Sequence, residues 1–208
     1  FHGPAYSTHR GTTYNSYLIL DEEPTLVDGV YPPFKKELLS NIRSLIDPKK
    51  LKYVVVNHLE KDHAGAIPDV MAAAPQATVL CSVKAEKPLR KIFPESKDWN
   101  LRVVKTGESV KIGKRTLAFV EAPMLHWPDS MFTYIPEEKL LLPNDAFGQH
   151  IATSGRFDDE ADMAELMQEA RKYYANILLP FSSQVLKKLE EVTEMGLEID
   201  MIGPSHGV

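Results

Sequence analysis

The chain contains the segment Tyr53-Val54-Val55-Val56-Asn57-His58-Leu59-Glu60-Lys61-Asp62-His63, a short apolar run followed directly by imidazoles and carboxylates. The apolar run predicts a buried strand. A buried strand that ends in this group would carry a large desolvation cost unless the polar side chains share a cation. In an extended loop, residues 58, 60 and 62 project to the same side and converge on one spot. The segment therefore predicts a metal site.

The composition indicates a protein with a core of ordinary size and without a basic surface. The chain has 208 residues, 43% of them hydrophobic, and a net charge of −5, so nucleic acid is not an expected partner. Its single cysteine, Cys81, lies in an apolar run and is expected to be a small buried hydrophobe, which fits a reducing cytoplasm. Apolar runs are far shorter than the ~20 residues of a membrane span, so we expect no membrane segment.

Strand-like and helix-like segments alternate along the chain, which favours one layered α/β (α+β) domain over residues 1–208. The expected strands are rich in apolar or β-branched residues and are bounded by Gly, Pro, Asp or Asn. They are 15–20, 25–28, 53–57, 77–81, 101–104, 115–120, 131–135 and 139–142. The expected helices are 33–46, 66–73, 83–93, 159–174 and 182–195, with Asp158 or Asp159 and Ser182 as N-caps of the last two.

Three further candidate ligands follow apolar segments elsewhere in the chain. His126 lies in Pro123-Met124-Leu125-His126-Trp127-Pro128-Asp129-Ser130, Asp145 in Asn144-Asp145-Ala146-Phe147-Gly148, and His206 in Pro204-Ser205-His206-Gly207. Loops at the ends of strands are where α/β sheets place their ligands. Taken singly, each residue is more often a turn or capping residue. Together with His58, Glu60, Asp62 and His63 they complete a set of seven candidate ligands.

With these motifs in order, the chain resembles the metallo-β-lactamase-like diiron domain of the flavodiiron proteins, which are oxygen and nitric oxide reductases. The resemblance extends from end to end of the chain. It includes Gly11-Thr12-Thr13-Tyr14-Asn15-Ser16-Tyr17-Leu18, the 58–63 loop, His126-Trp127-Pro128-Asp129-Ser130-Met131, Asn144-Asp145-Ala146-Phe147-Gly148-Gln149, Tyr173-Tyr174-Ala175-Asn176-Ile177 and Pro204-Ser205-His206-Gly207-Val208. The resemblance implies an αββα sandwich with the metal pair at one edge.

The resemblance also implies a ligand assignment. His58, Glu60 and His126 would bind one iron, Asp62, His63 and His206 the other, and Asp145 would bridge them, with an oxo or hydroxo bridge between the two irons. In some members of the family, solvent replaces the histidine equivalent to His63. Hydrolases of the wider superfamily carry histidine where this chain has Glu60 and usually bind zinc. A carboxylate there makes the site harder and more anionic, which suits iron in both oxidation states.

Several other residues have expected roles near the site. Two positions match family residues near the open face of the pocket, His2 and Tyr173, and the resemblance implies that they shape the cavity or hydrogen-bond the bound gas. Tyr173 fits equally well as a helix core residue. Asp28 is either a hydrogen-bond acceptor for a ligand histidine or a strand-end turn residue. His9 and His150 are expected to be ordinary loop histidines, although His150 lies close enough to Asp145 in sequence to join the outer shell.

The main departure from the family pattern is the absence of a flavodoxin-like FMN domain after Val208. No phosphate-binding loop is recognisable in the chain, so FMN is expected only in a domain that this chain lacks. The resemblance implies that electrons come from such a domain or from a rubredoxin-type donor, and that the parent protein is a head-to-tail homodimer.

Three functions are compatible with these observations. The first is a diiron reductase of dioxygen to water, or of nitric oxide to nitrous oxide, and the ligand set favours it. The second is a flavin-free diiron protein that binds or senses oxygen and signals through a partner, supported only by the missing flavodoxin part. The third is a zinc hydrolase, against which Glu60 argues.

Overall fold

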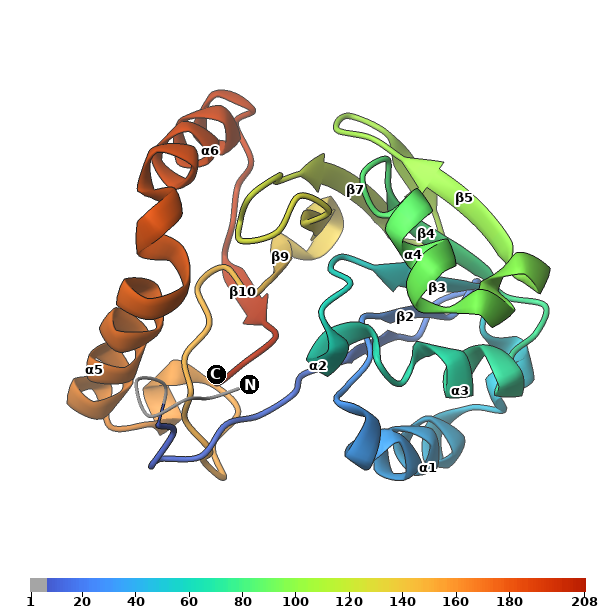
Figure 1. Ribbon diagram of the computed structural model, residues 1–208, viewed down its shortest axis with the longest axis horizontal. Helices are drawn as coiled ribbons and strands as arrows, with labels where there is room; N and C mark the ends of the chain where they lie inside the picture. The colour runs from blue at the N-terminus through green and yellow to red at the C-terminus, as the bar shows by residue number, and fades with distance from the viewer. Residues whose placement is uncertain (1–6) are drawn as a thin grey trace.

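The computed structural model describes residues 7–208 and contains two five-stranded sheets packed face to face between helices (Figure 1). The first sheet has the order β1-β2-β3-β4-β5, in which only β1 is antiparallel to its neighbour. Its strands are β1 (Tyr17–Ile19), β2 (Thr25–Val27), β3 (Tyr53–Val56), β4 (Thr78–Ser82) and β5 (Asn100–Val104).

The second sheet has the order β10-β9-β8-β7-β6, and it is antiparallel except where β10 pairs with β9. Its strands are β6 (Ser109–Lys111), β7 (Thr116–Glu121), β8 (Met131–Ile135), β9 (Leu140–Asn144) and β10 (Met201–Pro204). The sequence predicted eight of these ten strands and missed β6 and β10. Two alternating residues of β6 are exposed, and β10 starts with two exposed residues, so neither has the apolar pattern of a buried strand.

Helices cover the outer faces of both sheets. In Figure 1, α1 (Lys35–Leu45), α3 (Ile67–Ala73) and α4 (Glu86–Ile92) lie on the side of the first sheet, and α5 (Met163–Tyr173) and α6 (Ser182–Glu194) lie on the other side of the molecule. A π-helical turn, Tyr174–Leu178, and a 3-10 turn, Leu179–Phe181, connect α5 to α6. The N-cap of α5 is Asp162, not Asp158 or Asp159, because its carboxylate accepts hydrogen bonds from Ala164 and Glu165. Ser182 is the first residue of α6, and Phe181 precedes it as the cap.

Apolar residues of β3 pack on both faces of the first sheet. Val54 and Val56 pack into the cluster beneath α1 and α3, whereas Val55 between them packs against the second sheet with Phe119 and Met131. Successive side chains on a strand point to opposite faces, so an uninterrupted apolar run indicates a strand covered on both sides. This confirms the αββα sandwich expected from the sequence. Cys81 is buried as expected, and burial raises the pKa of its thiol to about 12.

Candidate metal centre

The predicted ligands come together at one edge of the sandwich, where β3, β9 and β10 end. His58 and Glu60 lie in the loop after β3, and a short helix, α2 (Lys61–Ala64), follows at once and carries Asp62 and His63. The remaining ligands come from the second sheet: His126 between β7 and β8, Asp145 directly after β9, and His206 after β10. The site is therefore built by both sheets.

The extended-loop prediction, with residues 58, 60 and 62 converging on one spot, is wrong for Asp62. The chain turns into α2 at Lys61, which rotates Asp62 away from Glu60. The side chains form two groups, in each of which the ligand atoms lie within 4.8 Å of one another. The groups are His58, Glu60, His126 and Asp145, and Asp62, His63 and His206.

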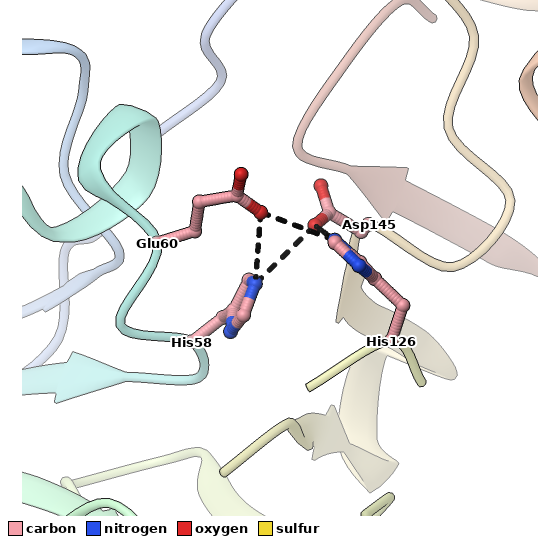
Figure 2. A group of neighbouring side chains, drawn as sticks. All are labelled: His58, Glu60, His126 and Asp145. Atoms are coloured by element: carbon pink, nitrogen blue, oxygen red, sulfur yellow. Dashed lines mark hydrogen bonds and ion pairs between the residues drawn. The ribbon is translucent and has the colours of Figure 1, made fainter. Parts of the chain in front are cut away.

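The first group is shown in Figure 2, where all four side chains point toward a common centre. His126 Nε2 lies 3.1 Å from both Glu60 Oε2 and Asp145 Oδ2. His58 Nε2 lies 3.3 Å from Glu60 Oε2 and 3.6 Å from Asp145 Oδ2. Two imidazoles and two carboxylates thus direct donor atoms to one position, an arrangement that suits a first-row transition metal.

The second group is more deeply buried. His63 Nε2 lies 3.5 Å from Asp62 Oδ1, and His206 Nε2 lies 3.4 Å from Asp62 Oδ2. All three residues are at most 5% exposed, and no hydrogen bond from the described residues reaches either carboxylate oxygen of Asp62. A buried carboxylate without hydrogen bonds is costly, and a cation between these side chains would remove the cost. The residues present therefore fit a second metal.

Asp145 joins the two groups. Its Oδ2 faces His58 and His126, while Oδ1 lies 2.9 Å from His63 Nε2 and 3.4 Å from His206 Nε2. One carboxylate thus presents one oxygen to each histidine pair, which is the geometry of a bridging ligand.

The ionised carboxylates of the first group favour a positive charge between the four side chains, on the histidines or on a bound cation. Burial disfavours a protonated His58, but hydrogen bonds to Asp129 and Glu60 raise the pKa of its imidazole to about 10. Burial likewise opposes ionisation of Glu60, but hydrogen bonds to His126 and His58 lower the pKa of its carboxyl to about 2. For Asp145, burial is outweighed by the charge of His63 and by hydrogen bonds from the histidines, so its pKa lies well below the ordinary value.

Asp129 was missed as a functional residue by the sequence reasoning. Its Oδ2 accepts hydrogen bonds from His58 Nδ1, at 3.2 Å, and from the backbone N–H of Leu59, at 2.7 Å. With Nδ1 held by Asp129, Nε2 of His58 faces the ligand group, where a metal would replace its proton. The signal was available, since Asp129 lies three residues after His126 in the quoted motif and ligand histidines need such acceptors.

Asp28 has a different role from the expected histidine contact. Its carboxylate accepts hydrogen bonds from Asn57 N at 2.8 Å, Asn57 Nδ2 at 3.1 Å and Asn144 Nδ2 at 3.0 Å. These asparagines directly precede His58 and Asp145. Asp28 and Asn144 both have positive φ, 57° and 55°, a conformation that Asp and Asn tolerate better than most residues. Asp28 therefore ties together the strand ends from which two ligands project.

Tyr173 and His150 lie beside the second group. Tyr173 is buried and its ring is 6.1 Å from that of His206, while the His150 ring lies 5.0 Å from His206 and 4.9 Å from Tyr173. Burial and the negative charge of Asp145 raise the pKa of the Tyr173 hydroxyl well above its ordinary value. His150 is thus part of the site's surroundings. His9 is exposed, as expected for a loop histidine, and His2 lies outside the described residues.

Comparison with known proteins gives a consistent result. The family model described as ODP family beta lactamase matches residues 12–207. A nitric oxide reductase of Moorella thermoacetica is 61% identical over the whole chain, which covers 52% of that protein. An anaerobic nitric oxide reductase flavorubredoxin of Salmonella arizonae is 46% identical over the whole chain, which covers 43% of it. The chain thus spans about half the length of the curated relatives that it matches.

Solved structures with the same fold include two similar proteins. Rubredoxin oxygen:oxidoreductase from Desulfovibrio gigas superposes with a TM-score of 0.94 at 46% identity, covering 97% of this chain and 50% of that one. The flavodiiron protein from Giardia intestinalis gives a TM-score of 0.94 at 44% identity, covering 100% of this chain and 50% of that one.

Proposed function

Since the chain belongs to the ODP family beta lactamase group, we propose that it is the non-heme diiron domain of an enzyme that reduces nitric oxide, dioxygen or both. The resemblance to flavodiiron proteins that its motifs indicated is confirmed by these relatives. Dioxygen would be reduced to water and nitric oxide to nitrous oxide. Which of the two gases this protein prefers depends on pocket details that the ligand set does not distinguish.

The observation that carries the proposal is the position of Asp145. Two metals held close together can both give electrons to one bound gas, and a carboxylate shared between the two ligand groups would hold them in this way. Asp145 directs one oxygen to His58 and His126 and the other to His63 and His206.

We assign the metals as the motifs implied. His58, Glu60 and His126 would hold one iron, Asp62, His63 and His206 the other, with Asp145 shared. The three carboxylates offset three of the four positive charges of two ferrous ions, so the buried centre stays close to neutral. When bound, the irons supply the electrons, and the protein supplies ligand geometry and a closed pocket.

The chain's own residues then have defined tasks. Hydrogen bonds at Nδ1 leave Nε2 free to bind metal in His58, through Asp129, and in His206, through a backbone carbonyl. Tyr173 would bound the cavity on the side of the second iron, and its raised pKa keeps the hydroxyl protonated as a hydrogen-bond donor to a bound gas. His2 stays a second candidate for such a contact.

The two alternatives are less well supported. The two curated relatives described above are named as reductases, which favours turnover over oxygen sensing through a signalling partner. Against a zinc hydrolase, Glu60 Oε2 lies 3.1 and 3.3 Å from the ring nitrogens of His126 and His58, where it would be a ligand. A carboxylate at that position makes the donor set harder than an all-imidazole one.

The remaining features of the proposal concern partners. Electrons would come from a flavodoxin-like FMN domain or a rubredoxin-type donor, as the names of the relatives indicate. A head-to-tail homodimer and a cytoplasmic location stay predictions. No helix within residues 7–208 is long and apolar enough to cross a membrane.

The test is metal and flavin quantification on the full-length protein, followed by anaerobic reduction and measurement of nitric oxide and oxygen consumption. About two irons per chain together with gas consumption is the expected result. Zinc without redox activity would contradict the proposal. Iron that forms a lasting oxygen adduct without turnover would favour the sensor.

A further inference from the structure

The segment of residues 7–17, here called the N-terminal strap, crosses the edge of the molecule that carries the metal ligands. At its start, Arg10 Nη1 pairs with Glu169 Oε1 of α5 at 3.0 Å, and Lys172 of the same helix donates to the carbonyl of Ser7 at 2.6 Å. Ala152 N donates to Arg10 O at 2.8 Å, beside Gly11, whose φ of +76° permits the close approach. The strap is therefore anchored before it reaches the site.

The strap then runs along the loop that carries His206. Asn15 Nδ2 donates to the carbonyls of Pro204 and Gly207, at 2.9 and 3.0 Å, and Asn15 N donates to Ser205 O at 2.8 Å. Gly207 N donates to the Thr13 hydroxyl at 2.7 Å. These hydrogen bonds flank His206 on both sides and fix its backbone.

The strap also contacts the ring of His206 itself. His206 Nδ1 donates to the carbonyl of Thr13 at 2.6 Å. His206 is 1% exposed, so water is not a ready substitute for this acceptor. The hydrogen bond places the proton on Nδ1 and leaves Nε2 to face Asp62 and Asp145.

The two ligand groups thus differ in which part of the chain orients their histidine side chains. In the first group, Asp129 fixes His58 from the loop between β7 and β8. In the second group, His206 is fixed by a segment far away in sequence, through a backbone carbonyl whose position depends on the side chains of Thr13 and Asn15.

We propose that the N-terminal strap is the positioning element of the second iron site, with Thr13 and Asn15 as its positioning residues. The inference rests on the proposed diiron function. It follows that loosening the strap weakens the iron held by Asp62, His63 and His206 and leaves the iron held by His58, Glu60 and His126 in place. Outer-shell contacts of this kind change metal affinity by about 10- to 100-fold.

The experiment uses the full-length protein, loaded anaerobically with ferrous iron and titrated with a chelator while the iron per chain is measured. Thr13→Val keeps the side-chain shape and removes the hydroxyl that accepts from Gly207 N. It should lose one of its two irons at a chelator concentration about tenfold lower than the wild type does, and the other at the wild-type concentration. Thr13→Ser keeps the hydroxyl and should restore both.

The matched control is Thr25→Val, which removes a buried hydroxyl that donates to Glu23 O outside the strap and both ligand groups. It should retain both irons like the wild type. A second variant, Asn15→Ser, removes the long amide that reaches Pro204 O and Gly207 O and should reproduce the loss of one iron even if Thr13→Val folds poorly.

Two results would overturn the inference: unchanged iron content in Thr13→Val and Asn15→Ser, or loss of both irons in parallel. Either can occur while the wild type binds two irons, so the proposed function would stand. A wild-type protein that binds no iron would instead overturn the proposed function.

Discussion

The hydrogen bond from His58 Nδ1 to Asp129 turns Nε2 of His58 toward the ligand group. In the hydrogen bonds described above, His58 is the one candidate ligand whose side chain Asp129 contacts. Asp129→Asn keeps the size of the side chain and removes the charge from the acceptor of His58 Nδ1. We expect the first iron to be bound about 10- to 100-fold more weakly. Chelator titration of the iron-loaded protein measures this effect.

The matched control is Asp47→Asn, which removes the charge of an exposed carboxylate that accepts from Lys49 N at the start of a 3-10 turn. It should leave the chelator titration unchanged. Equal iron affinity in Asp129→Asn and Asp47→Asn would show that the carboxylate of Asp129 does not orient His58.

Glu60 is the residue that separates an iron redox centre from a zinc site. Glu60→His replaces a carboxylate, whose Oε2 faces His58 and His126, with a neutral imidazole. The site loses a negative charge and becomes softer, so it should favour zinc over iron. We expect iron-dependent gas consumption to fall by about tenfold or more, measured together with metal content. The exposed Glu108→His is the control, and full retained activity of Glu60→His would refute the role given to this carboxylate.

The sequence predicted the side chains that gather in the two groups but not their surroundings. Residue type and position in a motif identify His58 or Asp145, because few side chains bind metal. The acceptor for His206 is the backbone carbonyl of Thr13, and every residue has such a carbonyl. Only the fold, which brings residue 13 beside residue 206, makes this one distinctive.

Among the helices and strands, the local sequence pattern predicted the buried strands. It failed where tertiary packing or a capping residue determines where an element lies. The run of valines predicted β3, which is covered on both faces. The one-turn helix α2 was not predicted, because Lys61-Asp62-His63-Ala64 has no apolar periodicity. Yet α2 divides the candidate ligands of the loop between the two groups. β6 and β10 were missed because they have too few buried residues.

The turn between β6 and β7 is held by Asp21, which follows β1 in the other sheet. Its carboxylate accepts hydrogen bonds from Lys114 N at 3.0 Å, Glu22 N at 2.8 Å and Arg115 N at 2.9 Å. The backbone hydrogen bond from Lys114, with the others, lowers the pKa of Asp21 to about 2. Asp21 thus stabilises the folded chain only while it is ionised.

The pH dependence of that contribution has a definite sign. Because the folded pKa of Asp21 is lower than the ordinary value of 3.8, its stabilisation is fully present above that value and is lost as the pH falls through about 2. Asp21→Asn should therefore be less stable than the wild type at about pH 5, and the difference should shrink toward about pH 2. Urea unfolding across this range measures it. The exposed Asp98→Asn is the control, and a difference for Asp21→Asn that is independent of pH would contradict the argument.

For the whole molecule, the arrangement of the two sheets explains why the site needs both halves of the chain. The first sheet contributes His58, Glu60, Asp62 and His63, and the second contributes His126, Asp145 and His206. Asp28 crosses between them, since its carboxylate binds Asn57 after β3 and Asn144 at the end of β9. The αββα architecture and the edge position of the site were predicted through the family resemblance, because no local pattern specifies how two sheets face each other.

For the whole molecule, the number of electrons that two irons can store limits how much gas the chain can reduce without an electron donor. Each ferrous ion gives up one electron, so a centre of two irons stores two, whereas reduction of dioxygen to water takes four. After anaerobic reduction and removal of the reductant, the two stored electrons should reduce at most about half an equivalent of dioxygen to water, or about two equivalents of nitric oxide to nitrous oxide. A gas electrode measures this stoichiometry after the reduced chain is mixed with limiting oxygen or nitric oxide. Adding a flavodoxin-like FMN domain with a reductant should restore continuous consumption, and the iron-loaded Glu60→His variant should then consume gas at about a tenth of the wild-type rate or less. Continuous turnover by the isolated chain without any donor would mean that its electrons come from a source other than the two irons.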